Sequence, residues 1–153
     1  MKEVNITIPD ESYTVVQYQN NGLPAIATIN EPILKFEAKE VFSYELFITI
    51  DFKEPNNVGM PSEKESKEID DFVDVLESKL VGFLNKPNVL IVAWVSWDGK
   101  RDLFFRVHDP EIAHKYLQSI IETEGIPKFD YIMRPDKKWK SIKWISKLLK
   151  GKR

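Results

Sequence analysis

Residues 88–108, with the sequence NVLIVAWVSWDGKRDLFFRVH, constrain the fold more than any other stretch of the chain. Two runs rich in β-branched and aromatic residues flank Asp98 and Gly99, a dipeptide that favours a two-residue type I′ turn. The segment therefore predicts an antiparallel hairpin. A turn at these two residues predicts the cross-strand pairs Trp97 with Lys100, Val95 with Asp102, Ala93 with Phe104, Ile91 with Arg106, and Val89 with His108.

A strand and a helix are predicted before this hairpin. Residues 41–53 alternate apolar and polar side chains, as in a strand with one buried face. Ser62 and Glu65 form a capping-box pattern, and we expect the helix that follows to end before Pro87. Its apolar stripe comprises Ile69, Phe72, Val73, Leu76, Leu80, Phe83 and Leu84.

A second helix and a last strand follow the hairpin. Asp109 is suited to be the N-cap residue, Pro110 to be the first helical residue and Gly125 to end the helix. The expected buried stripe of this helix is Ile112, Ala113, Tyr116, Leu117, Ile120 and Ile121. Residues 129–134, FDYIMR, form a short strand, which completes a βαββαβ order.

The ends of the chain add a hairpin and a helix to this order. Residues 12–29 contain two strand-like runs around Asn-Asn-Gly, a turn signal. The expected fold class is α+β: a ferredoxin-like βαββαβ antiparallel sheet with helices on one face, preceded by an N-terminal β-hairpin and followed by a basic C-terminal helix. At 153 residues we expect one domain, with 1–38 as the hairpin extension, 39–134 as the core and 135–153 as the basic tail.

Composition and charge narrow the functional classes. The chain has no cysteine, which excludes disulfides, thiolate zinc sites and cysteine nucleophiles. We find no signal peptide and no transmembrane segment, so we expect a cytoplasmic protein. Residues 134–153 contain nine Lys or Arg and one Asp, a net +8, while the 13 basic and 23 acidic residues before them give −10. An acidic body with a basic tail is the main compositional signal.

The first candidate binding surface is the sheet face that looks away from the helices. Alternation along the hairpin assigns Leu90, Val92, Trp94, Leu103, Phe105 and Val107 to the helix side. The opposite face is the candidate site, with Phe47, Asp51, Trp97, Asp102, Phe104, Arg106 and His108. We expect the N-terminal hairpin to fold across this face, because soluble domains hide large apolar patches.

The second candidate surface is the tail. It combines apolar residues with Lys138, Trp139, Lys140, Lys143, Trp144 and Lys147. Basic amphipathic helices bind anionic membranes, nucleic acid or acidic protein surfaces. The interpretation we favour is that the apolar stripe packs against the acidic body of the same chain and leaves the lysines in solvent.

Motifs of known chemistry are missing from the sequence. The set His108, Asp109, Glu111 and His114 is not expected to converge on a metal, because Asp109 and Glu111 already serve the start of a helix. The acidic residues at positions 70, 71, 74 and 77 are typical of a solvated helix face. No glycine-rich phosphate loop and no GxSxG motif occur, so we expect no metal and no cofactor.

Two alternatives to simple protein binding remain open. The first is a small hydrolase-like enzyme with a polar pocket around His108, Arg106, Asp102 and Asp51. The second is single-stranded RNA binding on the sheet face, since RNA-recognition motifs share the βαββαβ order and carry a basic and aromatic signature. The segment KRDLFFRV partly resembles that signature, with Arg101 in place of its glycine, and the acidic body repels phosphate.

The chain also resembles a bacterial family filed as domain of unknown function 695. The resemblance covers about residues 13–145 and is carried by an early strand that ends in NGLP, by YELFITIDF leading into GMP, by AWVSWDGKRDLFFRVHD and by DYIMRPDKKWKSI. It implies a cytosolic protein, and some members carry a second domain similar to the regulator of ribonuclease E activity B, a ferredoxin-like protein that binds an enzyme. This chain shows no such domain and has Tyr13 where the resemblance predicts Trp.

These observations together predict a non-enzymatic binding module that contacts an unidentified protein partner, with a role in the regulation of RNA metabolism as the more specific hypothesis. The resemblance assigns no residue roles. The enzyme alternative makes a geometric prediction of its own: His108, Arg106, Asp102 and Asp51 should converge on an open cleft.

Overall fold

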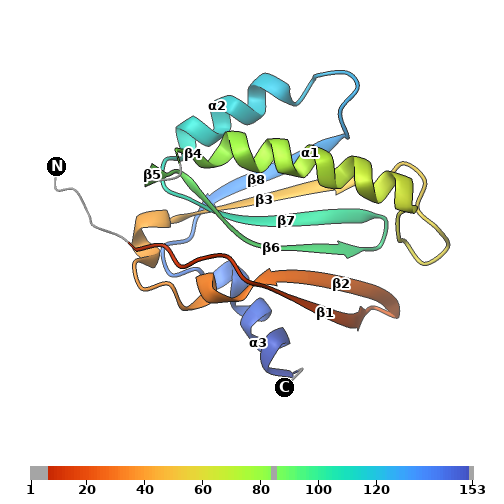
Figure 1. Ribbon diagram of the computed structural model, residues 1–153, viewed down its shortest axis with the longest axis horizontal. Coiled ribbons are helices and arrows are strands. Elements are labelled where there is room, and N and C mark those ends of the chain that lie inside the picture. Colours follow the sequence, from red (N-terminus) through yellow and green to blue (C-terminus); the bar gives the residue numbers. More distant parts are fainter. Residues whose placement is uncertain (1–6, 84–85, 152–153) are drawn as a thin grey trace.

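The computed structural model describes residues 7–83 and 86–151, which form a mixed α+β fold around a six-stranded antiparallel sheet (Figure 1). The strand order is β1-β2-β6-β7-β3-β8. The strands of this sheet are β1 (Tyr13–Asn20), β2 (Leu23–Asn30), β3 (Tyr44–Asp51), β6 (Val89–Trp97), β7 (Lys100–Val107) and β8 (Phe129–Pro135). Two short strands, β4 (Gly82–Phe83) and β5 (Lys86–Pro87), pair separately.

Helices cover the two sides of the sheet. The α-helices are α1 (Glu63–Val81), α2 (Pro110–Ile120) and α3 (Lys143–Gly151), and the short 3₁₀ helices are η1 (Glu31–Lys35), η2 (Lys39–Phe42) and η3 (Lys140–Ile142). Figure 1 shows α1 and α2 on one side of the sheet and α3 on the other. Within the described ranges, none of these helices combines the length and the apolar character that a membrane crossing requires.

The central hairpin has the predicted turn and a partly different register. Asp98 and Gly99 have φ angles of 49° and 82°, as a type I′ turn requires, and Trp97 pairs with Lys100. Farther from the turn, a β-bulge between Ile91 and Ala93 inserts one extra residue into β6. The predicted pairs of Ile91 with Arg106 and of Val89 with His108 are therefore wrong. The pairs beyond the bulge are Ile91 with Phe105, Leu90 with Arg106, and Val89 with Val107.

The bulge also exchanges the faces of the residues beyond it, because side chains alternate along a strand. Val89 and Ile91 pack in the core beneath α1 and α2, whereas Leu90 and Val92 pack on the opposite side. The assignment of Leu90 and Val92 to the helix side was wrong, while that of Trp94 is confirmed. The sheet is thus lined with apolar side chains on both sides of β6.

Helix α1 begins as predicted and ends earlier. The Ser62 hydroxyl accepts a hydrogen bond from the Glu65 N–H at 3.1 Å, but the Glu65 carboxylate accepts from the backbone N–H of Lys53, two residues after the end of β3. The helix ends at Val81 rather than near Pro87, because Gly82 adopts a φ of 73° and caps it. Four residues of the predicted stripe are buried: Ile69, Val73, Leu76 and Leu80. Phe72 is partly buried. The side chains of Phe83 and Leu84 lie outside the described part of the chain.

Helix α2 begins at Pro110, with the Asp109 carboxylate accepting from the N–H of Glu111 at 3.0 Å. It ends at Ile120, five residues before the Gly125 that we expected to end it. Ala113 and Leu117 are buried as predicted, but Ile112 is 59% exposed and does not belong to the buried stripe.

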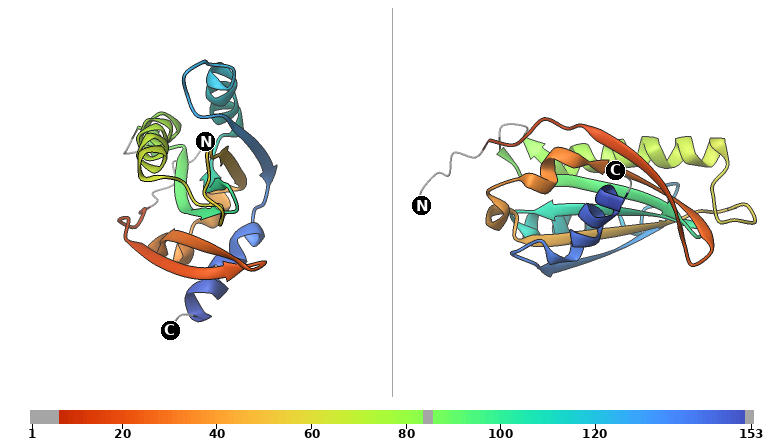
Figure 2. Two further views of the ribbon diagram at one scale, coloured as in Figure 1. Left: turned by 90° about the vertical axis from the view of Figure 1, so that its right-hand side faces the viewer. Right: turned by 90° about the horizontal axis from the view of Figure 1, so that it is seen from below.

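The N-terminal hairpin forms as predicted but does not fold across the sheet. Asn21 and Gly22 both have positive φ, and β2 pairs with β6, so the hairpin extends the sheet at its edge. The far side is instead covered by η1, η2, η3 and α3 (Figures 1 and 2). Their buried residues form the second core cluster with Val16, Ala27, Ile29 and Ala93: Ile33, Phe36, Phe42, Trp139, Ile142, Ile145 and Leu149.

Candidate functional site

The side of the sheet opposite α1 and α2, which we call the far face, carries the predicted site residues. Register places Phe47 opposite Phe104, and Lys100 opposite both Asp51 and Trp97, so these side chains share one face. The elements that cover the far face pack over β6, β2 and one end of β7. Strands β3 and β8 lie toward the opposite edge of the sheet.

An apolar strip crosses this less covered part. It consists of Ile132, Phe47, Phe104 and Trp144, from β8, β3, β7 and α3, and we call it the aromatic row. Ile132 and Phe104 both pair with Phe47. The ring centroids of Phe47 and Phe104 are 5.2 Å apart, and those of Phe104 and Trp144 are 5.5 Å apart. Ile132 is 49% exposed and Trp144 is 38% exposed, so solvent reaches both ends of the row.

Asp102 lies beside the aromatic row, two residues before Phe104 on the same face of β7. Its Oδ1 atom is buried and has no hydrogen-bond partner within the described residues. Burial raises the pKa of this carboxyl, while a hydrogen bond from the Thr49 side chain and the charge of Lys100 act in the opposite direction. A buried acceptor without a donor is unfavourable by about 1 to 3 kcal/mol. Burial of this oxygen is therefore a cost to the fold that no hydrogen bond within the described residues offsets.

Trp97 and Asp51 occupy the end of the far face near the hairpin turn. The Trp97 Nε1 donates to the carbonyl oxygen of Asn20 at 2.9 Å, which ties β6 to the N-terminal hairpin. The ammonium group of Lys100 lies 5.5 Å from the Trp97 ring centroid, within the range of a cation–π contact. Asp51 is exposed at the end of β3.

Arg106 has a structural role. Its side chain is fully buried and pairs with Asp136, with 3.0 Å between Nη1 and Oδ2, while Nη2 donates to the Phe42 carbonyl at 3.3 Å. The guanidinium lies 4.8 Å from the centroid of the Trp139 ring. Because these groups enclose it, Arg106 is not accessible to a ligand on the far face.

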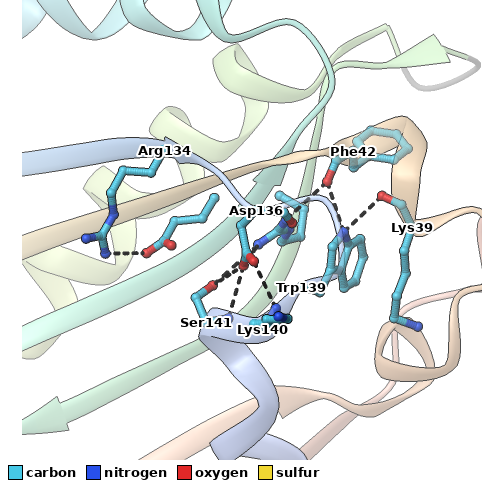
Figure 3. A network of polar contacts seen from close by, with 9 residues as sticks. Lys39, Phe42, Arg134, Asp136, Trp139, Lys140 and Ser141 are labelled. Atoms are coloured by element: carbon cyan, nitrogen blue, oxygen red, sulfur yellow. Dashed lines mark hydrogen bonds and ion pairs between the residues drawn. The ribbon is translucent and has the colours of Figure 1, made fainter.

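Asp136 links this arginine to the tail. Burial raises the pKa of its carboxyl, but hydrogen bonds from Ser141, Arg106 and the Lys140 backbone outweigh burial and lower the pKa to about 2. Oδ1 accepts from the Lys140 N–H, and Oδ2 accepts from the Ser141 N–H, both at 3.0 Å. The carboxylate therefore caps the start of η3 and holds the tail against the sheet (Figure 3).

The tail packs as the favoured interpretation predicted. Trp139 is buried, with its Nε1 donating to the carbonyl oxygens of Lys39 and Phe42, so it is not a surface residue. Trp144 remains in the aromatic row. The other candidates of the tail are exposed lysines, which precede and follow Trp144 in the sequence: Lys138, Lys140, Lys143 and Lys147.

The two histidines lie in separate places. His108 Nδ1 is 2.7 Å from the Val41 carbonyl oxygen, and His114 Nδ1 is 2.7 Å from the Tyr131 hydroxyl. Within residues 7–83 and 86–151, no group of three or more His, Cys, Asp or Glu is arranged to hold a metal ion.

The polar cleft of the enzyme alternative is not assembled. Asp102 and Arg106 are four residues apart on one strand, a separation of about 13 Å. The Arg106 guanidinium is enclosed by Asp136, Phe42 and Trp139. The convergence on which that alternative depended is therefore absent for these residues.

The far face combines an open apolar centre with charged surroundings, an arrangement typical of protein interfaces. Sequence reasoning missed two of its members, Ile132 and Tyr18. Alternation along FDYIMR places Ile132 on the same face as Phe47, so the sequence pattern could have identified it.

Tyr18 lies near Asp102 because of the N-terminal hairpin. Burial raises the pKa of the Tyr18 hydroxyl, and the charge of Asp102 raises that pKa further. That proximity depends on the pairing of β2 with β6, which no local pattern predicts.

Comparisons with known proteins identify a family. No curated protein and no solved structure matches the chain. A family described as "Family of unknown function (DUF695)" matches residues 11–143, which is most of the sequence. The resemblance seen in the sequence motifs is confirmed, and the chain belongs to this family of unknown function.

Proposed function

We propose that the chain is a protein-binding module whose contact surface is centred on the aromatic row. The observation that carries this proposal is the exposure of Ile132 and Trp144 at the two ends of a continuous apolar strip. Exposed apolar strips with polar rims are typical of interaction sites, and buried tryptophans contribute strongly to binding energy in such interfaces.

The charges around the row suggest the chemistry of the partner. The exposed lysines of the tail favour carboxylates on the partner. Asp51, which is exposed near the hairpin turn, favours a Lys or Arg side chain of the partner at the opposite margin. The partner surface would therefore be apolar at its centre and carry both signs of charge.

The finer description of the fold belongs to the same proposal. Strands β8, β3, β7 and β6 are consecutive in the sheet, and α1 and α2 follow β3 and β7 in the chain. This order supports a ferredoxin-like core, with residues 1–38 and 135–153 as additions to a single domain. The family resemblance to chains that carry an enzyme-regulating domain supports a partner from RNA metabolism.

Single-stranded RNA is the second candidate ligand. Phe47 and Phe104 lie side by side on neighbouring strands, and Trp144 of α3, a helix with exposed lysines, contacts Phe104. Bases stack on such rings, and lysines bind phosphates. The acidic body of the chain, with a net charge of −10 before residue 134, opposes this ligand.

Affinity capture with matched variants tests the proposal. The variant Ile132→Ser/Trp144→Ser removes the two exposed ends of the row. The control Ile112→Ser/Val75→Ser removes two apolar residues from α2 and α1 that are more exposed, at 59% and 57%. We expect a protein that wild type and control capture equally and that the row variant captures about tenfold less. Each variant is first checked for cooperative thermal unfolding.

Nuclease treatment of the lysate separates the two candidates. Retention of the captured protein after nuclease supports a direct protein contact. If capture depends on intact RNA and the row variant loses the RNA, the far face binds nucleic acid instead. Equal capture by both variants would refute a role for the aromatic row.

A further inference from the structure

The outer edge of β1 is the less protected of the two edges of the sheet. Each edge strand, β1 and β8, pairs with one neighbour. Strand β8 carries Asp130, Arg134 and Pro135, the kinds of residue that discourage further strand pairing. Strand β1 has the sequence YTVVQYQN, with no charged residue, no proline and no glycine. An eight-residue edge of this composition is suited to accept another strand.

The hydrogen-bond pattern shows which backbone groups of β1 face outward. The Glu31 N–H donates to the Ser12 carbonyl at 3.1 Å, which continues the β1–β2 ladder past the pair Tyr13 and Asn30. Hydrogen-bonded and non-bonded pairs alternate in an antiparallel ladder. Even-numbered residues of β1 therefore bond to β2, whereas the N–H and C=O groups of Tyr13, Val15 and Gln17 point away from the sheet.

The side chains of these outward residues lie on the α1 side of the sheet and are open to solvent. Val15 is 61% exposed and Tyr13 is 38% exposed, with the Tyr13 ring centroid 5.1 Å from that of Trp94. A groove of about 470 Å³ lies next to β1, because it is lined by Ile26 and Thr28, which pair with Gln17 and Val15, and by the first turns of α1. Figure 2 shows the hairpin away from α2, on the same side of the molecule as α3.

The charges beside this edge are acidic. Tyr13 interacts with the carboxylates of Glu11 and Glu77, and Glu77 interacts with Asp74. Burial raises the pKa of Glu77 to about 7, and the charges of Glu11 and Asp74 add to this effect. None of the ion pairs found in the described part of the chain involves these three carboxylates. A cation placed here would relieve the repulsion between them.

We propose that the outer edge of β1 is a strand-addition site for an extended segment of a partner protein that presents Lys or Arg toward α1. The added strand lies about 4.8 Å from β1 and bonds to the backbone of Tyr13, Val15 and Gln17. Its alternate side chains then lie over Tyr13 and Val15, beside the carboxylates of Glu11 and Glu77. This site is independent of the aromatic row, which lies on the other face of the sheet.

Amide hydrogen exchange tests the proposal with defined peptide probes. One acetylated ten-residue peptide alternates Lys with Thr, and its control alternates Glu with Thr. In the free protein we expect slow exchange at Thr14, Val16 and Tyr18 and fast exchange at the odd positions between them. The Lys peptide should slow exchange at Tyr13, Val15 and Gln17 by at least about tenfold, while the Glu peptide leaves it unchanged.

Substitutions at Val15 provide the matched control. Val15→Pro removes an N–H that points outward and leaves the β1–β2 ladder intact. Val15→Lys places a charged side chain at the edge, which disfavours the addition of a further strand, and keeps every backbone hydrogen bond of β1. Both should abolish the peptide-dependent protection at Tyr13 and Gln17, whereas Val75→Lys, on the exposed side of α1, should leave it unchanged.

Three results would overturn the proposal. Unchanged exchange with the Lys peptide shows that the edge does not accept a strand. Equal protection by the Glu peptide would show that the carboxylates of Glu11, Asp74 and Glu77 do not contribute to recognition. Protection of the odd-numbered amides that grows with protein concentration, without any peptide, assigns the edge to a second copy of this chain. Neither peptide experiment involves Ile132 or Trp144, so failure here is distinguishable from failure of the proposed function.

Discussion

At the scale of residues, Arg106 and Asp102 lie on the same face of β7 and differ in what surrounds their charges. The guanidinium of Arg106 has Asp136, the Phe42 carbonyl and the Trp139 ring around it. Asp102 has a buried oxygen without a donor. The Nε atom of Arg106 also lacks a hydrogen-bond partner within the described residues, so the two side chains differ in how many of their polar atoms are satisfied. Each buried polar atom without a partner is unfavourable for the fold.

Glu77 provides a pH-dependent test at this scale. Its folded-state pKa of about 7 is higher than the ordinary value of 4.5 because of burial and of the charges of Glu11 and Asp74. Between pH 4.5 and 7 the unfolded chain loses this proton and the folded chain keeps it, so stability falls as the pH rises. Above pH 7 the Glu77 carboxyl is ionised in both the folded and the unfolded state, so the free energy of unfolding falls no further. Glu77→Gln should therefore stabilise the protein at pH 8 and have no effect at pH 4.

Solvent screening at this half-buried position limits the expected gain at pH 8 to about 1 kcal/mol. Urea unfolding at the two pH values measures it. Glu68→Gln is the matched control, because Glu68 is exposed on the same helix, and it should leave the difference between pH 4 and pH 8 as in wild type. A Glu77→Gln gain that is equal at both pH values would contradict the assignment.

At the scale of elements, the sequence predicted structures that depend on local chemistry. The turns at Asp98-Gly99 and Asn21-Gly22 follow from backbone preferences of two residues, and the N-cap at Ser62 follows from one hydroxyl. The β-bulge in β6 was not predictable, because Leu90, Ile91 and Val92 are all apolar and alternation leaves no signal when both faces are buried.

The candidate site was predicted in part for the same reasons. Phe47 and Phe104 lie on β3 and β7, where simple alternation identifies the face. The burial of Arg106 depends on Asp136, thirty residues later in the chain, and on a tail whose position was unknown. Contacts between segments that are distant in the sequence determine which of these side chains are buried, and local sequence patterns do not predict such contacts.

Removal of the tail tests the role of α3 as an element. Deleting residues 139–153 removes Trp139, Ile142, Ile145 and Leu149 from the far-side core. Each large apolar residue lost from a core lowers the free energy of unfolding by about 2 to 5 kcal/mol, so the sum approaches the whole stability of a domain. We expect the truncated chain to lack a cooperative thermal transition in circular dichroism.

Two point variants make the same test within the full-length chain. Leu149→Ala should lower the free energy of unfolding by about 3 kcal/mol, because Leu149 is buried. Lys147→Ala, at an exposed position of the same helix, should change it by less than about 0.5 kcal/mol. A truncated chain that unfolds like wild type would show that the tail is only peripheral.

At the scale of the whole molecule, the family motifs coincide with the contacts that join distant elements. The glycine of GMP, Gly59, lies against the turn at Asp98, where a Cβ atom would come within 2.8 Å of the Asp98 Cα. Its carbonyl accepts from the Gly99 N–H at 2.8 Å. The segment DYIMRPDKKWKSI supplies Asp136, Trp139 and Ser141 to the network around Arg106. The roles of these motifs in the fold therefore explain their residues without any catalytic reaction.

The two cores of the molecule share strands, and this predicts a single unfolding transition. Strand β6 contributes Ile91 to the core beneath α1 and Ala93 to the core beneath α3, so neither core persists when the sheet separates. Methyl signals of Leu76 and Ile33, one buried in each core, report the two sides in a urea titration followed by NMR. We expect midpoints that agree within about 0.2 M, since one sheet supports both cores. An earlier loss of the Ile33 signal would instead show that the far-side layer unfolds as a separate unit, and binding at the aromatic row would then depend on that layer alone.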